Sequence, residues 1–230
     1  MKRMDWGGDG VHRGAMTPAT QAPPRPPRRD QAAAAAARAA ALAQHDPATA
    51  RTLALEALAQ AHADPDPAAA STAERALGLV AVATRDIDAA LRHLRRAVRV
   101  AERHGLREPA ATAREILAGT LIWGGDPAGA LREIERAAPL LRGGQLGRLE
   151  MRRGLALYFQ GRLDEALAAY RAALALLRRA GDHEYQAKLL NNRSMLHYQR
   201  GELKAAEADL RRAEELFAQL GQDTAVAEIW

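Results

Sequence analysis

The 230-residue chain contains no cysteine, and only 4% of its residues are aromatic. Without cysteine, this sequence has no disulfide, no thiolate metal ligand and no cysteine nucleophile. Hydrophobic residues still make up 48% of the chain, so a good-sized core must be built mainly from aliphatic side chains. A core of this kind suits thin, stacked pairs of helices.

Long uncharged apolar runs are also missing. No segment approaches the roughly eighteen apolar residues of a membrane-spanning helix. The N-terminus is basic but lacks the apolar stretch of a secretory signal. We therefore expect a cytoplasmic protein that has no membrane partner.

The net charge of +5 is unevenly distributed. Six bases and three acids place +3 of it in residues 1–30, so the rest of the chain carries only +2. A phosphate-binding surface needs a clustered basic face, whereas arginines here alternate with glutamates along amphipathic segments. We predict solvated helix faces and no nucleic-acid binding by the folded part.

Residues 1–30 are rich in Gly, Pro and Arg and show no hydrophobic periodicity. They cannot bury enough apolar surface to offset the entropy of ordering, so the sequence predicts a disordered basic leader. Within it, Pro23–Arg28 reads PPRPPR, which favours the polyproline II conformation that aromatic grooves recognise. The alternative interpretation, which we favour, is a stiff basic leader without a partner.

From Gln31 onward the sequence predicts helices throughout, and one pattern recurs. It is clearest in RGLALYFQGRLDEALAAYRAALALL and RSMLHYQRGELKAAEADLRRAEELF, which begin at Arg153 and Arg193. Its register places turns at His45, Arg85, Gly125, Gly161 and Gly201, at equal intervals except for a shorter one between Gly125 and Gly161. Alanine stands at the fifth position after every turn and again seven positions later, at Ala50, Ala57, Ala90, Ala97, Ala130, Ala137, Ala166, Ala173, Ala206 and Ala213. The pattern resembles the tetratricopeptide repeat, a unit of helix, tight turn and helix.

The recurrent alanines have a packing reason. Two antiparallel helices approach to about 8–10 Å only where the residues at their crossing are small. Between the two alanines lies a position that fills the space between layers, occupied by Ala54, Leu94, Ile134, Tyr170 and Leu210. The turns support the same boundaries, because Asp46, Asp86 and Asp126 follow them and can cap the next helix.

Most intervals between turns exceed the roughly 34 residues that are usual for this repeat. We expect the extra length to extend helices around Asp64–Pro67, Arg99–Arg107 and Arg178–Glu184. The short interval coincides with Arg142–Gly147, where three glycines weaken helix formation. This stretch is the predicted hinge or bend.

Together these patterns predict an all-α, right-handed solenoid of about five antiparallel helix pairs and the start of a sixth. The repeat domain covers residues 31–230, with repeats at approximately 31–64, 71–105, 110–142, 146–181 and 184–221 and a partial helix at 223–230. The polyalanine run Ala32–Ala37 fits the first helix of an atypical N-terminal cap. Trp230 falls at the fourth position of a sixth repeat, where this kind of repeat often carries tryptophan. We therefore expect the front of a longer protein; the alternative is a terminal half-helix that covers Leu210, Phe217 and Leu220.

Motifs for chemistry are lacking. Gly143–Gly147 has neither the lysine nor the preceding strand of a phosphate-binding loop, and the seven histidines show no spacing suited to zinc. We expect His197 to be a packed, hydrogen-bonded histidine, and Asp164 and Glu165 to favour the positive end of a helix dipole. The sequence thus predicts no catalytic residue, no metal, no cofactor and no enzymatic activity in this chain.

The first helix of each pair should line a concave groove in which much of the aromatic content gathers. Rings and polar side chains there could hold an extended or helical segment by stacking and charge-assisted hydrogen bonds. The candidate partner-binding residues are Trp123, Arg148, Arg152, Tyr158, Phe159, Lys188, Asn191 and Tyr198. Packing of the aromatics between layers is an equally good interpretation. Leu79 and Ile116 occupy two places that a carboxylate clamp for chaperone tails would need, so we do not expect that ligand.

GRLEMRRGLALYFQGRLDEALAAYRAALALLRRAGD and LLNNRSMLHYQRGELKAAEADLRRAEELFAQLG resemble the N-terminal repeats of actinobacterial CHAT proteins, most clearly over residues 145–221. The resemblance implies a sensor or scaffold region upstream of a caspase-like peptidase, whose catalytic cysteine and histidine would belong to another domain. Regulators with similar repeats beside a DNA-binding or nucleotide-binding domain fit nearly as well. The predicted function is thus binding of a protein or peptide ligand, in a CHAT-type system or in a transcriptional or ATPase regulator. The sequence leaves open whether exposed end layers pair two chains into a dimer.

Overall fold

The computed structural model describes residues 28–221, which contain ten α-helices, one 3-10 helix and no strand. The helices are α1 (Arg28–Leu42), α2 (Pro47–Ala63), α3 (Pro67–Ala83), α4 (Ile87–Arg103), α5 (Arg107–Trp123), α6 (Pro127–Ala137), the 3-10 helix η1 (Ala138–Leu140), α7 (Gly143–Phe159), α8 (Leu163–Arg179), α9 (His183–Gln199) and α10 (Leu203–Gln219). The first helix begins slightly before the predicted start of the domain. The rest of the expected leader, the partial helix at 223–230 and Trp230 lie outside the described residues.

Each predicted turn joins the two helices of one pair. Gly125, Gly161 and Gly201 have φ values of 82°, 73° and 73°, a region that glycine adopts without steric cost. Arg85 has a φ of 60° at the equivalent place. After the first three turns, the side chains of Asp46, Asp86 and Asp126 accept hydrogen bonds from backbone N–H groups in the next helix, as the cap assignment predicts.

The alanine register is confirmed. All ten recurrent alanines are buried, and nine of them have no exposed surface. At the position between them, Ala54, Leu94, Ile134 and Tyr170 are fully buried, and Leu210 is half-buried. The small residues therefore lie where the helices cross, and the larger ones fill the space between layers.

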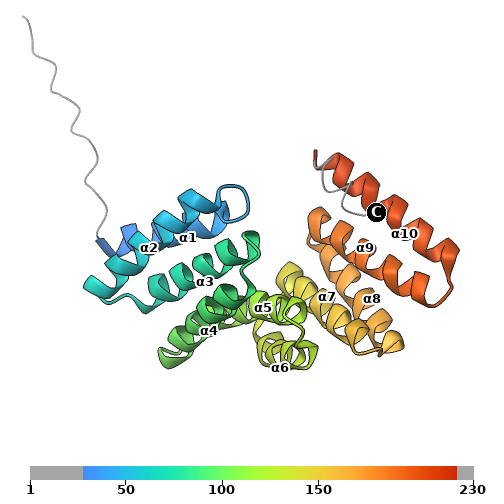
Figure 1. Ribbon diagram of the computed structural model, residues 1–230, viewed down its shortest axis with the longest axis horizontal. Coiled ribbons are helices and arrows are strands. Elements are labelled where there is room, and N and C mark those ends of the chain that lie inside the picture. Colours follow the sequence, from blue (N-terminus) through green and yellow to red (C-terminus); the bar gives the residue numbers. More distant parts are fainter. Residues whose placement is uncertain (1–27, 222–230) are drawn as a thin grey trace, which may run out of the picture.

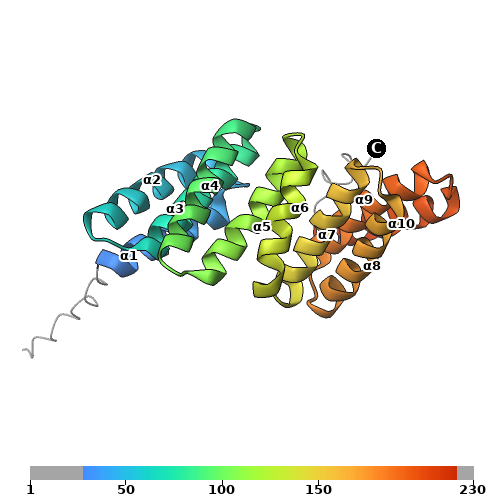
Figure 2. The ribbon, with the colours of Figure 1, turned by 90° about the horizontal axis from the view of Figure 1, so that it is seen from below.

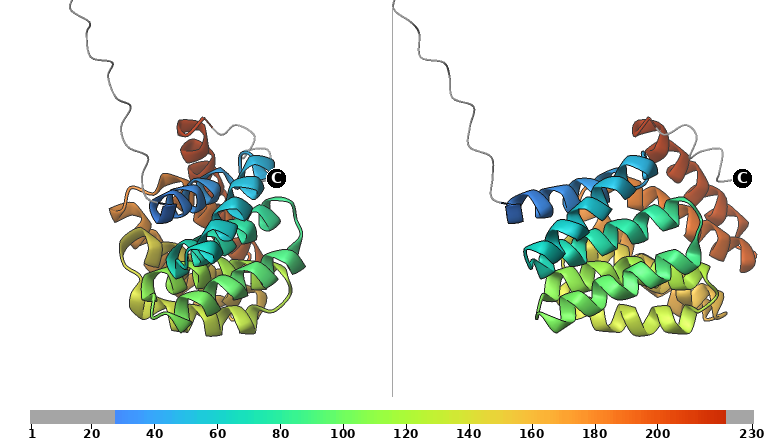
Figure 3. Two further views of the ribbon diagram at one scale, coloured as in Figure 1. Left: turned by 90° about the vertical axis from the view of Figure 1, so that its left-hand side faces the viewer. Right: turned by 60° about the vertical axis from the view of Figure 1, so that its left-hand side comes forward.

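The stack is curved, with the first helices of the pairs on its inner side. Consecutive first helices contact one another, from α1 with α3 to α7 with α9, in addition to the contacts within and between neighbouring pairs. The second helices α4, α6 and α8 lie along the outer side, while the pairs α1–α2 and α9–α10 rise at the two ends (Figure 1). Figure 2 shows the pairs following one another along the long axis, and Figure 3 views the stack from its α1–α2 end. The predicted all-α solenoid of five antiparallel helix pairs is confirmed for residues 28–221.

The extra length of the repeats goes into both helices of each pair. Every helix from α2 to α10 except α6 has 17 residues, and short turns join most of them. Helix α6 has only 11 residues and passes into η1, where Pro139 cannot donate a backbone hydrogen bond and interferes with the preceding turn. The short interval thus comes from the truncated end of α6. The glycines of Arg142–Gly147, predicted to be a hinge or a bend, lie in the first turns of the continuous helix α7.

Candidate functional site

A hollow of about 500 Å³ lies on the inner side of the stack. It is lined mainly by the first helices α3, α5, α7 and α9. On each of these helices, the residues that face the hollow recur every three or four positions. The lining combines cations with aliphatic side chains, so it is neither purely polar nor purely apolar. Its members are Gln44, Arg75, Leu79, Val82, Ile87, Thr112, Glu115, Ile116, Gly119, Thr120, Trp123, Arg148, Met151, Arg152, Leu155, Tyr185, Lys188 and Asn192.

Glu115 of α5 is the acidic centre of this hollow. Its carboxylate accepts a hydrogen bond of 2.6 Å from Nε of Arg152 on α7, and both side chains are largely buried. Gly119 makes room for this pair, because a Cβ there would lie only 2.8 Å from Cζ of Arg152. A larger residue at this position would therefore push the guanidinium away from α5.

The two arginines near Glu115 have opposite pKa shifts. Burial lowers the pKa of Arg152. The charges of Glu115 and Tyr185 and the hydrogen bond to Glu115 raise this pKa by a larger amount, so the net shift is upward. Burial also lowers the pKa of Arg75, and here the more distant charge of Glu115 offsets only part of that effect. Arg75 donates no hydrogen bond to another described residue. It is therefore a cation of the hollow that can pair with an incoming anion without giving up a hydrogen bond.

A second charged cluster lies between α7 and α9. Arg148 Nη1 is 3.0 Å from Oδ2 of Asp182, the residue that also caps α9 through Tyr185 N. The guanidinium of Arg148 and the ammonium of Lys188 each lie 5.0 Å from the centre of the Tyr185 ring, within the range of a cation–π interaction. Lys188 also donates to Glu184 at 2.5 Å. The ring thus holds two cations at the edge of the hollow.

Four of the eight predicted partner-binding residues line this hollow: Trp123, Arg148, Arg152 and Lys188. Asn192 lines it where Asn191 was predicted. A shift of one residue turns a side chain by about 100° around the helix, so a small error in register changes which face a residue occupies.

The remaining predicted aromatics lie beside the hollow or away from it. Tyr158 is half-buried and packs against the core of the C-terminal repeats. Phe159, at the end of α7, is 50% exposed and contacts Trp123 edge to face, with 6.2 Å between ring centres. Tyr198, near the end of α9, is 71% exposed. Trp123 and Phe159 therefore form an aromatic rim, while Tyr158 follows the alternative interpretation of packing between layers.

Sequence reasoning missed Tyr185 and Gly119. Tyr185 precedes the predicted Lys188 by three residues, which places both on one face of α9, and that spacing was a signal for it. Gly119 had no such signal, since only the position of the Arg152 guanidinium shows why a side chain is absent there. Elsewhere, His197 is packed and hydrogen-bonded to Glu202, as expected.

Within residues 28–221, no three His, Asp or Glu side chains gather in a way that could hold a metal ion. None of the helices there is long and apolar enough to cross a membrane.

Comparisons with known proteins identify a matching family and structures of similar fold. Residues 145–219 match the tetratricopeptide repeat family, and no curated protein matches the chain. Among solved structures, BtubC (BKLC) from P. vanneervenii is 19% identical, with a TM-score of 0.64 over 86% of this chain and 93% of that one. PlcR from Bacillus thuringiensis, solved with the peptide PapR7 and DNA, is 12% identical, with a TM-score of 0.70 over 87% of this chain and 74% of PlcR. A putative kinesin light chain from Podosopora anserina with nearly identical TPR-like repeats is 13% identical, with a TM-score of 0.63 over 86% and 100%.

Identities this low show the fold alone. The chain has the fold of a tetratricopeptide-like helical solenoid, and residues 145–219 form a tetratricopeptide repeat region.

Proposed function

We propose that this chain is a non-catalytic protein-interaction module whose inner hollow binds an extended or helical segment of another protein. The observation that carries the proposal is the composition of the hollow, which is lined by four cations, Arg75, Arg148, Arg152 and Lys188, and by one carboxylate, Glu115. Repeat solenoids use such concave surfaces to bind extended partners. Backbone carbonyls or a carboxylate of the segment would pair with the cations, and its apolar side chains would contact Leu79, Ile116 and Met151.

The lining supports binding rather than catalysis. The hydroxyl of Thr120 donates to the Ile116 carbonyl, and the lining contains no histidine to activate a nucleophile. Glu115 is engaged with Arg152 and is not poised as a base. The same residues can nevertheless orient a peptide, because charge-assisted hydrogen bonds are directional.

At a finer level, we propose that the module recognises partners for a peptidase of the CHAT type. This rests on the sequence resemblance over residues 145–221. A second candidate is the sensing region of a regulator, favoured by the similarity in fold to PlcR, which was solved with a peptide and DNA. Co-purification from the native cell separates the two: a caspase-like peptidase supports the first, and a DNA-binding or nucleotide-binding protein supports the second.

The experiment begins by identifying the segment that enters the hollow. A photo-crosslinking amino acid at Ile116 should capture it, and the same group at Arg171, on the exposed face of α8, serves as the control position. A synthetic peptide of the captured segment is then titrated by fluorescence anisotropy against the wild type and the double variant Arg75→Gln/Lys188→Gln. We expect at least about a tenfold loss of affinity, because each charge-assisted hydrogen bond contributes about 1.5–3 kcal/mol.

The matched control is Arg171→Gln/Arg178→Gln, which removes the same charge from an exposed helix face. It should bind the peptide like the wild type. Equal weakening of both double variants would mean that the peptide responds only to net charge, and the inner hollow would not be its site.

A further inference from the structure

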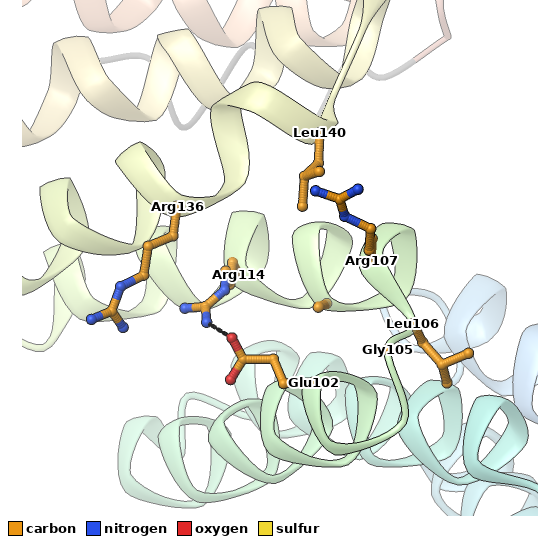
Figure 4. A pocket seen from close by; sticks show the side chains of 8 residues that line it. Glu102, Gly105, Leu106, Arg107, Arg114, Arg136 and Leu140 are labelled. Atoms are coloured by element: carbon orange, nitrogen blue, oxygen red, sulfur yellow. Dashed lines mark hydrogen bonds and ion pairs between the residues drawn. The ribbon is translucent and has the colours of Figure 1, made fainter.

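A second hollow, of about 670 Å³, lies on the outer face between α4, α5 and α6. Its wall includes the cations Arg107, Arg114 and Arg136, the carboxylate of Glu102, and two leucines, Leu106 and Leu140 (Figure 4). Sequence reasoning gave no role to these residues, and the proposed function of the inner hollow does not use them.

The hollow exists because α6 is short. The end of α6 lies beside the start of α5, because the two helices of a pair are antiparallel. Helix α6 stops at Ala137 after 11 residues, whereas the other second helices, α2, α4, α8 and α10, each have 17 residues. The missing turns leave a space beside the first part of α5, where Ala110 and Arg114 line the hollow. The irregular repeat thus opens a space that the regular repeats fill with helix.

The charges in this space are not all neutralised. Arg114 is buried and forms ion pairs with Glu102 of α4 and Glu133 of α6, so its charge is matched. Arg136 lies 3.5 Å from Glu133, a carboxylate already engaged by Arg114. Arg107 is exposed and forms no ion pair with another described residue. Arg107 and Arg136 are therefore available to an incoming anion.

A row of arginines extends along α4, the helix whose Glu102 lines the outer hollow. Arg92, Arg96, Arg99 and Arg103 follow the i, i+4, i+7, i+11 spacing that puts them on one face, and all four are exposed. The row is about 16 Å long, and its last member, Arg103, directly follows Glu102 in the sequence. The buried residues of α4, such as Leu94 and Ala97, occupy the opposite face. Only Arg96 of the row approaches a carboxylate, Glu74, at 4.0 Å, among the described residues.

We propose that this arginine row and the outer hollow together form a docking surface for an acidic segment of a partner protein. Carboxylates of the segment pair with the row and with Arg107 and Arg136, and an apolar side chain enters the hollow between Leu106 and Leu140. Charge complementarity selects the partner and speeds its association. This surface lies on the outer face and is independent of the inner hollow.

The chemistry of the surface favours a polypeptide over a nucleic acid. Neither α4 nor the lining of the outer hollow contains Phe, Tyr or Trp, and the ring of His93 on α4 is hydrogen-bonded to Glu74, so the surface lacks the large rings on which bases stack. The leucines offer a contact for an apolar side chain, which a sugar–phosphate backbone lacks. The outer face of α4 carries arginines rather than large apolar side chains, so it has no residue to insert into a lipid surface.

The test uses the full chain and a fluorescein-labelled peptide of glutamates and aspartates around a single leucine, titrated by fluorescence anisotropy. The variant Arg99→Glu/Arg107→Glu changes two exposed side chains and should weaken binding by about tenfold or more. The control Arg171→Glu/Arg178→Glu makes the same change of net charge on α8 and should stay within about twofold of the wild type. A peptide with alanine in place of leucine should bind several-fold more weakly, because the hollow loses an apolar contact.

Three results would overturn the proposal: no binding of the acidic peptide by the wild type, equal weakening in both charge-reversal variants, or equal binding of the leucine and alanine peptides. A labelled polyuridine RNA provides a fourth outcome. If it binds as tightly as the peptide and is lost in the same variant, the surface is a nucleic-acid site instead. Because Arg75→Gln/Lys188→Gln leaves the outer face unchanged, it should bind the acidic peptide normally, so this proposal and that of the inner hollow can fail separately.

Discussion

Replacing Gly154 with alanine should destabilise the protein although alanine is the better helix former. Gly154 lies inside α7, and a Cβ there would be 2.6 Å from Cδ1 and Cε1 of Tyr170 on α8. The Tyr170 ring has no exposed surface, so it cannot turn away into solvent. Overpacking of this kind costs about 1–3 kcal/mol, whereas glycine to alanine in a helix gains about 1 kcal/mol. We expect a net loss of up to about 2 kcal/mol in the free energy of unfolding.

The preceding repeat shows which second substitution should restore the stability lost by Gly154→Ala. The preceding repeat has Ala118 and Ile134 where this one has Gly154 and Tyr170, and both of those residues are buried. In the background Tyr170→Ile, the change Gly154→Ala should therefore be neutral or stabilising. Urea unfolding followed by circular dichroism measures all four proteins of the cycle, and the coupling should be about 1–3 kcal/mol. An equal cost of Gly154→Ala in both backgrounds would refute the packing argument.

Three further predictions follow from single sites and are all measured by urea unfolding. Arg85→Gly should stabilise the protein by about 1 kcal/mol, because it relieves a positive φ of 60°; a loss of stability would contradict the assigned strain. Arg152→Met should cost about 3–5 kcal/mol by leaving the buried Glu115 carboxylate without its partner, while the double variant Arg152→Met/Glu115→Leu should be close to neutral. Burial raises the pKa of Glu150 more than Arg153 lowers it. The folded state therefore favours the protonated form, and stability falls as the pH rises above about 4.3, the ordinary pKa. Glu150→Gln should remove this decline, and unchanged pH profiles would count against it.

The register of the fold could be predicted from the sequence because its cause is local and repeated. Closely packed helices need small residues at their crossings, so alanine at Ala50, Ala90 and Ala130 marks the same place in each pair. The turn glycines and the capping aspartates carry the same period. Each of these signals depends only on neighbours a few residues away or one repeat away.

The site was less predictable because it depends on how the layers are rotated. Tyr158 and Phe159 are adjacent in sequence, yet Tyr158 packs against the core and Phe159 lies on the rim. The rim contact with Trp123 joins two repeats, so the register within a single helix does not determine it. The short third repeat was visible in the sequence, where it coincides with the glycines after Leu141, but the sequence analysis did not identify Pro139, beside which the helix before them ends.

The same packing rule explains why both candidate surfaces are rich in arginine. Because alanine fills the crossings, the layers are too closely spaced for long charged side chains, which must extend to the inner or the outer face. Where the repeat is regular, the crossings remain closed and apolar. Where it departs from the pattern, an arginine occupies the space: Arg152 lies against Gly119 on the inner face, and Arg114 lies in the gap left by the short α6 on the outer face. Both guanidinium groups bridge two helices through carboxylates, so each irregularity of the repeat places a charged cluster beside a hollow. Lengthening α6 should therefore close the outer hollow while the inner one keeps its shape.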